Sequence, residues 1–307
     1  MNWKPVAVIG DDYLKDVEFC EFWCVKTINK KSISKLIGIA DSIYSFEDWK
    51  HLKRVKSDQD KAAVLITPVQ CSTSNYIKQQ LNYLTVEDDS VLEICTIKVP
   101  LTKPLTRSQY NQAIKVWPVS FHEDKQLERK IHGNLFTETD LVCMQEYMNT
   151  AITMASSTTE CSSGAVMVDP AIPKIVAISP PELSQKHCLQ HPVMACIDLV
   201  ACQQGGGTWI KTEDSTTASS QCEPPESKRL KLSQQYLCTG LDLYVTREPC
   251  IMCSMALVHS RIKRVFYGIT NPSIGGLGSK YKIHTHVAIN HHFEVYSGIM
   301  DQECGCL

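Results

Sequence analysis

The alternation of apolar and polar positions predicts that the first third of the chain is an independent α+β unit. Strand-like runs and helix-like spacings follow one another there in the order β-α-β-β-α-β. The strands are expected at 22–28, 51–55, 61–68 and 92–99, and the helices at 32–44 and 75–84. This order is that of the split βαβ arrangement, so we expect a ferredoxin-like domain with an antiparallel sheet and two helices on one face.

From residue 140 the pattern becomes a series of strands alternating with helices, which is typical of a three-layer α/β domain. Helices are expected at 140–156, from 191 onward and at 249–260, and strands at 165–168, 175–178, 241–246 and 264–268. The segment 203–235 interrupts the series with three glycines, a Ser/Thr-rich run and a Pro-Pro pair, and it has too few apolar residues to order itself. We therefore predict domains at 1–110 and 140–307, a linker at 111–139 and a flexible insertion at 203–235.

Composition agrees with two globular domains. The 307 residues are 43% hydrophobic and 21% charged with a net charge of −2, which excludes both chain-wide disorder and a chain-wide basic field. Fifteen cysteines are scattered from Cys20 to Cys306 and no secretory apolar region follows Met1, so we expect reduced thiols in a reducing compartment. No stretch approaches the roughly 20 apolar residues that span a bilayer, and we expect no membrane contact.

A candidate metal site comes from a Pro-Cys-x-x-Cys sequence at the start of a predicted helix. Cys250 and Cys253 have the spacing that lets two thiolates point at one ion, and a helix N-terminus favours the thiolate form. Taken alone, such a pair also fits a redox site or chance. His191 opens the preceding predicted helix, 59 residues before Cys250, and without the insertion this distance leaves room for the rest of that helix and one strand. Although a single His is more often structural, His191, Cys250 and Cys253 are predicted to bind Zn²⁺.

These motifs resemble the zinc nucleobase deaminases of the cytidine/deoxycytidylate deaminase superfamily. That family carries H-x-E followed by P-C-x-x-C, in which His and two Cys hold zinc and the Glu shuttles the proton of the attacking water. The position of this Glu is occupied here by Val193, which cannot move a proton. Glu248, just before the Pro-Cys pair, is also found in active tRNA adenosine deaminases beside their separate catalytic Glu, so we interpret it as structural.

Within that superfamily the chain is similar to the non-catalytic subunits of the eukaryotic heterodimeric tRNA wobble-adenosine deaminase. The resemblance is strong from Asp140 to about Tyr296 and weaker before it. It implies a cytidine-deaminase-like fold, bound Zn²⁺, a catalytic partner subunit that supplies the intact Glu, and a heterodimer that converts the wobble adenosine of tRNA to inosine. This chain would contribute dimerisation and tRNA binding. Two alternatives stay open: an active nucleobase deaminase with an unusual base, and a stand-alone zinc-stabilised RNA-binding protein.

Local groups of basic residues are the candidates for tRNA contact. Four of them fall within seven residues beside two aromatic rings: Lys50, Lys53, Arg54 and Lys56, with Trp49 and His51. Such a set suits phosphate and base contacts, although lysines on a solvated strand edge would look the same. Arg261, Lys263 and Arg264 form a weaker candidate.

Two further expectations concern the insertion and the chain end. The basic cluster Lys228–Lys231 follows two prolines and fits a nuclear-import signal, which agrees with a protein of nucleus and cytoplasm, although a solubilising charge run is equally compatible. An inactive site needs no substrate path, so the fourth zinc position is predicted to be closed by Cys304, Cys306 or the terminal carboxylate of Leu307.

Overall fold

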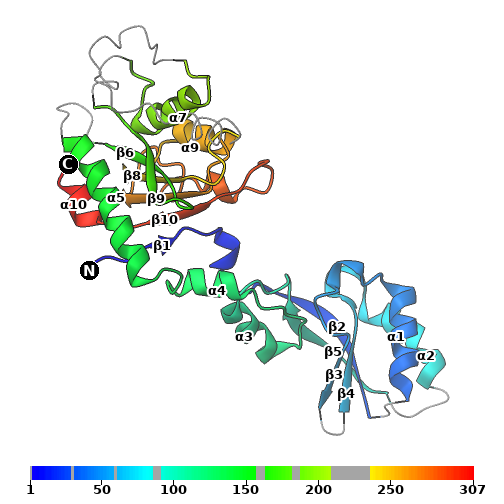
Figure 1. Ribbon diagram of the computed structural model, residues 1–307. Coiled ribbons are helices and arrows are strands. Elements are labelled where there is room, and N and C mark those ends of the chain that lie inside the picture. Colours follow the sequence, from blue (N-terminus) through cyan, green and yellow to red (C-terminus); the bar gives the residue numbers. More distant parts are fainter. Residues whose placement is uncertain are drawn as a thin grey trace, which may run out of the picture. The chain divides into compact units, whose positions relative to one another are not determined.

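The chain folds into two compact units, and one of them is assembled from both ends of the sequence (Figure 1). The computed structural model describes residues 2–28, 31–58, 61–85, 91–156, 163–181, 187–208 and 236–307. The first unit comprises Met1–Gly10 with Arg129–Leu307, and the second comprises Asp11–Glu128. The predicted domain boundaries at 110 and 140 are therefore displaced, and the first ten residues belong with the later part of the chain.

The second unit is built on a four-stranded antiparallel sheet. Its elements are β2 (Phe19–Thr27), α1 (Ser32–Ile43), β3 (Val55–Asp58), β4 (Lys61–Pro68), α2 (Ser74–Thr85), β5 (Val91–Pro100) and α3 (Arg107–Val116), with short 3-10 turns η1 (Asp11–Tyr13), η2 (Glu47–Trp49) and η3 (Val69–Cys71). The strand order is β3-β4-β2-β5, and all neighbours are antiparallel. The predicted order β-α-β-β-α-β is thus observed, whereas membership of the ferredoxin-like class stays a prediction.

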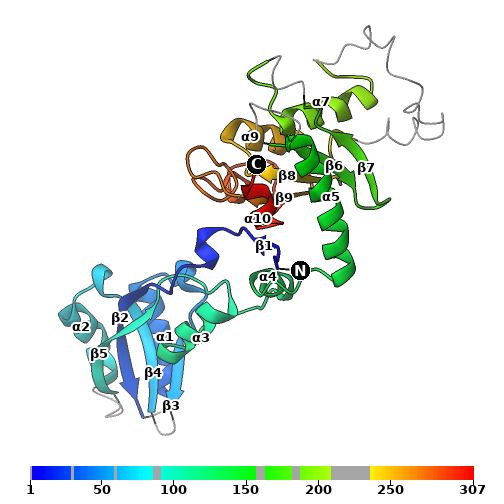
Figure 2. The same ribbon diagram turned by 90° about the vertical axis from the view of Figure 1, so that its left-hand side faces the viewer.

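Helices cover both faces of this sheet (Figures 1 and 2). On one face, Leu36 of α1 and Ile77 of α2 pack with Val64 in a single buried cluster. On the other, Ala113 of α3 and the following Trp117 pack in a second cluster. α3 starts with a capping box, which satisfies two of the backbone N–H groups at its first turn. The predicted linker at 111–139 is therefore wrong at its start, because α3 is a packed element of the sheet unit.

One predicted strand is misplaced. The sequence predicted a strand at 51–55, but β3 begins at Val55, and His51 and Leu52 lie in the turn before it. Leu52 instead forms an isolated bridge with Val119 and is 4% exposed. The position of β3 is set by its pairing with β4, in which Val55 lies opposite Val64, and such pairing is not visible in a local apolar pattern.

The first unit has a six-stranded mixed sheet in the order β1-β10-β9-β8-β6-β7. Its elements are β1 (Val6–Ala7), α4 (Lys125–Ile131), α5 (Glu138–Ser156), β6 (Ala165–Asp169), β7 (Lys174–Ile178), α7 (Pro192–Gln203), β8 (Asp242–Arg247), α9 (Ile251–His259), β9 (Arg264–Ile269), η5 (Ile283–Thr285), β10 (Glu294–Ser297) and α10 (Asp301–Gly305), with α4 crossing the boundary between the units. β8, β9 and β10 are parallel, and β6, β7 and β1 run antiparallel to their neighbours. The chain has the mixed α/β architecture that was predicted.

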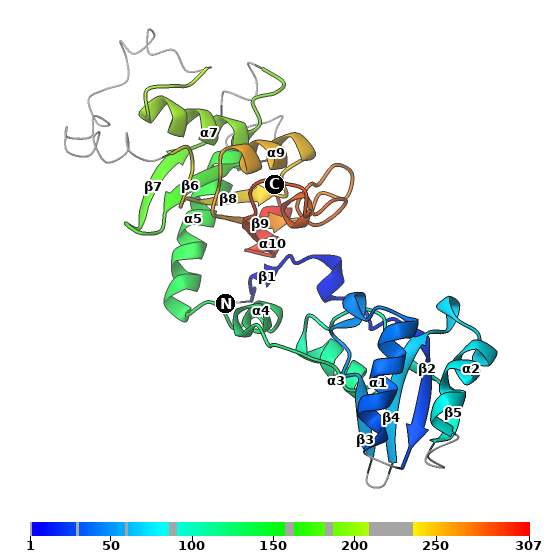
Figure 3. The same cartoon turned by 90° about the vertical axis from the view of Figure 1, so that its right-hand side faces the viewer.

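This sheet is the middle layer of three, as predicted (Figure 3). α7 and α9 pack on one face, where Cys196 and Leu257 belong to one buried cluster with strand residues. α5 and α10 pack on the other. There Tyr244, Phe266 and Tyr296 stack across three parallel strands, with ring centroids 4.7 and 5.2 Å apart. The stacked rings pack neighbouring strands β8, β9 and β10 against one another. Because these strands are parallel, their carboxyl ends meet at one edge of the sheet.

The amino terminus completes the sheet of the first unit. β1 pairs antiparallel with β10, and the Val8 N–H donates to the Val295 carbonyl at 2.8 Å. Trp3 is 8% exposed and packs in the same cluster as α5 and α10. These contacts explain why the first ten residues do not belong to the unit that follows them directly in sequence.

The described ranges include α7 up to its end at Gln203 but only the first residues of the predicted insertion. Residues 209–235, with the basic cluster Lys228–Lys231, lie outside the described residues. Among the helices that are described, none is both long and apolar enough to cross a membrane.

Candidate metal centre

The three predicted metal ligands lie at the starts of two neighbouring helices. His191 is the N-cap of α7, and Cys250 is the N-cap of α9 directly after β8. Pro192 occupies the first turn of α7, where its missing N–H has no helical partner to lose. Because α7 and α9 pack on the same face of the sheet, their first residues meet at its edge.

The ligand atoms are close enough to share one ion. His191 Nδ1 lies 3.4 Å from Cys250 Sγ and 3.5 Å from Cys253 Sγ, and all three ligand atoms lie within 4.8 Å of one another. Zinc bonds of about 2.0–2.3 Å in a tetrahedral site place neighbouring ligand atoms roughly 3.5–3.8 Å apart. Two sulfurs and one imidazole nitrogen are also a donor set that suits zinc and disfavours magnesium or calcium. The side chains fit a zinc ion with three protein ligands.

The thiols of Cys250 and Cys253 have different pKa values because of their contact with each other. The hydrogen bond from Cys253, followed by the backbone N–H of Cys253 and the His191 ring, lowers the pKa of Cys250 to about 5 against the opposing effect of burial. The same pairing, together with burial, raises the pKa of Cys253. One thiolate is therefore stabilised at neutral pH, which is the form that binds a metal.

Val193 is two residues after the metal ligand His191, and its side chain provides no acid or base to the centre. Its side chain is 3% exposed and packs in the core cluster beneath the ligands. Apart from His191, Cys250 and Cys253, no His, Cys, Asp or Glu of the described residues joins the ligand group. The part of the centre that the structure describes thus supplies metal ligands but no proton carrier.

Glu248 is close in sequence to the metal ligands, but its carboxylate is occupied by a neighbouring loop. It accepts the backbone N–H groups of Asn271 at 2.9 Å and of Leu277 and Ser279 at 3.0 Å each, and the Ser279 hydroxyl as well. The side chain is 2% exposed. These bonds agree with the structural role predicted for Glu248 and leave its oxygens no room to act as a general base.

The loop held by Glu248 also supports the metal ligand Cys250. Gly275 forms an isolated bridge with Cys250, and the Gly276 N–H donates to the Pro249 carbonyl at 2.9 Å. A Cβ on Gly275 would lie 2.4 Å from a Glu248 oxygen, so only glycine allows this close approach. Glu248 therefore positions the turn that carries Cys250.

The expectation that Cys304 closes the fourth metal position is wrong. Its side chain is 1% exposed and packs in the cluster with α5 and α10, on the face of the sheet opposite to α7 and α9. Cys306 is exposed, and its thiol donates to the Gln302 carbonyl at 3.3 Å. Closure by the carboxylate of Leu307 stays a prediction.

Among the predicted tRNA contacts, Arg54 is engaged within the protein, whereas Lys50 is exposed. Arg54 is 15% exposed at its side chain, pairs with Asp41 at 2.9 Å and lies 4.0 Å from the centre of the Phe46 ring. Burial lowers the pKa of its guanidinium although Asp41 opposes that shift. Lys50 pairs with Glu47. Arg54 therefore offers no free charge to a phosphate, whereas the exposed Lys50 stays a predicted contact.

The aromatic neighbours are internal as well. Trp49 packs edge-on against Phe22 with centroids 4.7 Å apart, and His51 is 9% exposed with its Nε2 at 3.0 Å from the Pro100 carbonyl oxygen. The prediction that these rings stack on bases is therefore wrong, because both rings fill the face of the sheet that α3 covers.

Lys53 and Lys56 remain exposed and meet a third lysine that the sequence did not single out. The Lys53 backbone exchanges hydrogen bonds with Trp117 and Pro118, and Lys56 Nζ donates to the Val116 carbonyl at 3.2 Å. Lys115, also exposed, precedes this segment at the end of α3. Across the described ranges none of these three lysines has a carboxylate within ion-pair distance. We call Lys53, Lys56 and Lys115 the lysine cluster; only the tertiary fold brings Lys115 to it.

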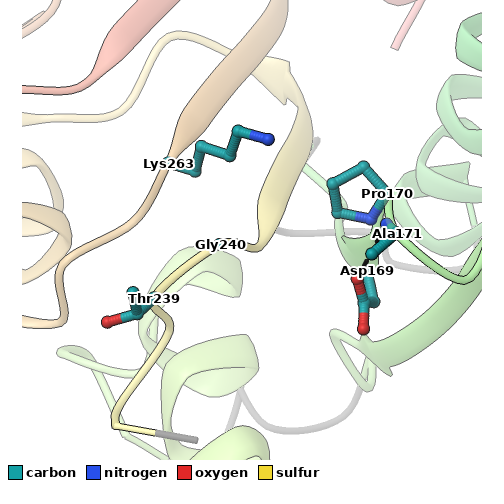
Figure 4. A pocket seen from close by; sticks show the side chains of 6 residues that line it. All are labelled: Asp169, Pro170, Ala171, Thr239, Gly240 and Lys263. Atoms are coloured by element: carbon teal, nitrogen blue, oxygen red, sulfur yellow. Dashed lines mark hydrogen bonds between the residues drawn. The ribbon is translucent and has the colours of Figure 1, made fainter.

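A cavity lies at the opposite end of the strands from the metal ligands. It has a volume of about 380 Å³ and is lined by Asp169, Pro170, Ala171, Thr239, Gly240 and Lys263 (Figure 4). Lys263 directly precedes β9, whereas Cys250 follows the end of the parallel strand β8. Arg264 beside it pairs with the buried Asp242 across β8 and β9. The weaker candidate group of Arg261, Lys263 and Arg264 is thus remote from the metal ligands and partly used in the core.

The outward face of α9 is unusually apolar for a surface helix. Cys253 and Leu257 face the core, yet Ile251 and Met255 on the other side are 41% and 36% exposed. Ile274, in the loop held by Glu248, is 48% exposed nearby. A helix that is apolar on all sides is normally buried, so this face is suited to contact another protein. We call Ile251, Met255 and Ile274 the α9 surface.

Comparison with known proteins places this centre in a family context. The family model for the cytidine and deoxycytidylate deaminase zinc-binding region matches residues 141–269. The "Probable inactive tRNA-specific adenosine deaminase-like protein 3" of Danio rerio is 36% identical over 316 residues, covering 99% of this chain and 94% of the relative. The human protein of the same name is 34% identical, with 98% and 91% covered. The "tRNA-specific adenosine deaminase subunit tad3" of Schizosaccharomyces pombe is 30% identical, with 82% and 75% covered.

Proposed function

Because the chain belongs to the family of tRNA-specific adenosine deaminase-like protein 3, we propose that it is the non-catalytic subunit of a tRNA deaminase that converts the wobble adenosine to inosine. The observation that carries this proposal is Val193, buried at the position where active deaminases carry their proton-shuttling Glu. Glu248 does not replace it, because four donors occupy its carboxylate.

The test is inosine formation on tRNA by this chain alone, by a catalytic subunit alone and by the two together. We expect inosine only in the mixture, and none in the mixture after the catalytic subunit's own glutamate is replaced. Inosine formed by this chain alone would support an active deaminase instead. A mixture without inosine would support a stand-alone RNA-binding protein.

The ion proposed for the ligand group His191, Cys250 and Cys253 is Zn²⁺, at about one per chain. Bound zinc would join the starts of α7 and α9, and any water that it activated would lack general acid–base help worth about 10²–10⁴ in rate. The residues of this chain therefore act by holding the ion and the two helix starts together. Metal analysis of Cys250→Ala should show reduced zinc content and reduced stability; full zinc in that variant would refute the ligand assignment.

The catalytic subunit is proposed to dock on the α9 surface. A subunit that supplies the missing Glu needs a stable contact with this chain, and the α9 surface combines exposed apolar side chains with a loop fixed by Glu248. We expect Met255→Asp to abolish co-purification of the two subunits. Ile172→Asp is the matched control, because Ile172 is 63% exposed in the turn between β6 and β7, away from α9. Equal co-purification of both variants would contradict this docking face.

The second unit is proposed to bind tRNA through the lysine cluster, as part of the same complex. Three exposed lysines near the end of α3 suit phosphate contacts, which depend on charge rather than on base identity. Arg54 is left out of this surface because its largely buried charge is paired with Asp41.

For localisation we propose nucleus and cytoplasm, supported by the sequence of the Lys228–Lys231 cluster alone. Alanine at Lys228, Arg229 and Lys231 should shift a fluorescent fusion towards the cytoplasm while the complex stays active in extract. An unchanged distribution would make the cluster a solubilising charge run.

A further inference from the structure

Two cysteines face each other across the central strands of the second unit. Cys24 of β2 lies directly opposite Cys95 of β5 in the antiparallel register. Directly opposed residues of antiparallel strands have Cα atoms about 4.5–5.5 Å apart, inside the roughly 4.4–6.8 Å range of disulfides. The strand register therefore places the two cysteines at a Cα separation that a disulfide can span.

The two thiols differ in access. Cys24 is fully buried, whereas Cys95 is half-buried and within reach of a small molecule. Burial first, and then the charge of Cys95, raises the pKa of Cys24 to about 12, so Cys24 remains a protonated thiol. Cys95 is the side chain that a dissolved oxidant meets first.

A cation stands beside the accessible sulfur. The next rung of the same strand pair on this face is Lys26 opposite Glu93, joined by an ion pair of 2.9 Å. Lys26 is therefore two residues along β2 from Cys24, on the same face of the sheet. A partly exposed cysteine beside a cation is open to dissolved oxidants in a way that a fully buried cysteine is not. Structural buried cysteines lack both the access and the cation.

We propose that Cys24 and Cys95 are an oxidative modification site, in which a hydroperoxide converts the two thiols to a cross-strand disulfide. The Cys95 sulfur attacks one peroxide oxygen, the O–O bond breaks, and Cys95 becomes a sulfenic acid while water, or an alcohol from an organic hydroperoxide, leaves. The Cys24 sulfur then attacks the Cys95 sulfur, the S–O bond breaks, and the hydroxyl leaves as a second water with the Cys24 proton. Two thiols are oxidised and one peroxide is reduced.

The bond would tie the two longest strands of the unit together. It closes a segment that runs from residue 24 to residue 95 and contains α1, β3, β4 and α2. Closing a long segment restricts the unfolded chain more than the folded one. The oxidised unit is therefore more resistant to unfolding, and this effect is separate from the metal centre and from the proposed deaminase complex.

The experiment uses the full-length, metal-loaded chain treated with hydrogen peroxide and digested without reduction. We expect one linked peptide pair containing Cys24 and Cys95, which separates on addition of dithiothreitol, and a higher unfolding midpoint of the oxidised protein. Cys24→Ser should remove the link and leave a sulfenic acid on Cys95 that dimedone traps. Cys95→Ser should remove both the link and the trapped adduct.

The matched control is Cys71→Ser, which removes an exposed cysteine of the same unit and should leave the link intact. Peroxide that modifies Cys71 or Cys143 while Cys24 and Cys95 stay free thiols would overturn the proposal. So would irreversible over-oxidation of Cys95 in the unmodified sequence without any link to Cys24.

Discussion

At the scale of single residues, the metal centre keeps its metal ligands, whereas Val193 replaces the residue that would transfer a proton. His191, Cys250 and Cys253 keep a zinc-type donor set, while Val193 fills the neighbouring position with two methyl groups. We expect Val193→Ala to leave inosine formation by the assembled complex nearly unchanged, because Val193 moves no proton. The poorer packing should cost about 1–2 kcal/mol in the free energy of unfolding, measured by urea titration. A large drop in activity at unchanged stability would assign Val193 a role in the reaction.

His284 is a second residue with a measurable consequence. It is 4% exposed, its Nε2 lies 2.8 Å from the Val8 carbonyl oxygen, and its Nδ1 has no hydrogen-bond partner among the described residues. Burial, which outweighs the hydrogen bond to Val8, lowers the pKa of His284 to about 4. The folded protein therefore keeps this ring neutral over a range in which the unfolded chain protonates it.

The sign of the pH effect follows from that difference. Because an unfolded His has a pKa of about 6.5, the stability that His284 provides is complete above that pH and is lost as the pH falls towards 4. The decrease should be about 1.4 kcal/mol per pH unit and about 3 kcal/mol in all. Urea unfolding between pH 7 and pH 4.5 measures it, with His284→Gln as the control that removes the titration. Identical pH slopes for the two proteins would contradict this assignment.

At the scale of elements, the sequence predicts what is long and periodic and misses what depends on a distant partner. β4 was predicted at its observed bounds, 61–68, because a continuous apolar run of that length is typical of a buried strand. β1 has two residues and β10 has four, too few for any period to be visible, and both are fixed by pairing across the whole chain. α3 is polar enough to pass for a linker, although Ala113 and Trp117 anchor it.

The candidate functional residues likewise could be predicted where a local motif specifies them, and could not where they depend on a distant part of the chain. His191, Cys250 and Cys253 could be found from the sequence because a short motif and one helix start specify them. Lys115 could not, since it lies far along the chain from Lys53 and Lys56 and no local pattern connects them. The apolar outward face of α9 was visible as sequence, but its exposure depends on what packs on the inner side.

Strand β1 gives the prediction that belongs to this scale. Trp3 anchors the strand and is 8% exposed, so Trp3→Ala should destabilise the first unit by about 3–5 kcal/mol. The second unit should keep its own unfolding transition, because it contains none of the first ten residues. Calorimetry of the full chain separates the two transitions. A lowered transition of the second unit alone would show that Trp3 serves that unit instead.

At the scale of the whole molecule, the proposed division of labour places metal binding in one unit and tRNA binding in the other. Replacing Lys53, Lys56 and Lys115 by Ala should raise the KM of the complex for tRNA while kcat changes little. It should also reduce the slope of log affinity against log salt by roughly 0.7–0.9 for each tRNA phosphate that is no longer neutralised. The control is Arg54→Lys, which keeps the largely buried charge that pairs with Asp41 and should leave the slope unchanged. An unaltered slope in the triple variant would show that the lysine cluster is exposed to solvent without contacting tRNA phosphates.

The pairing of β1 with β10 also sets an order of events during protein synthesis. Val6 is synthesised 291 residues before its partner Ser297. The unit Asp11–Glu128 is complete long before that and can fold while translation continues. β1 therefore waits for β10 to be made before it can pair, while the unit Asp11–Glu128 does not. We expect a ribosome stalled after residue 290 to carry a folded sheet at 11–128 and an amino terminus still open to proteases.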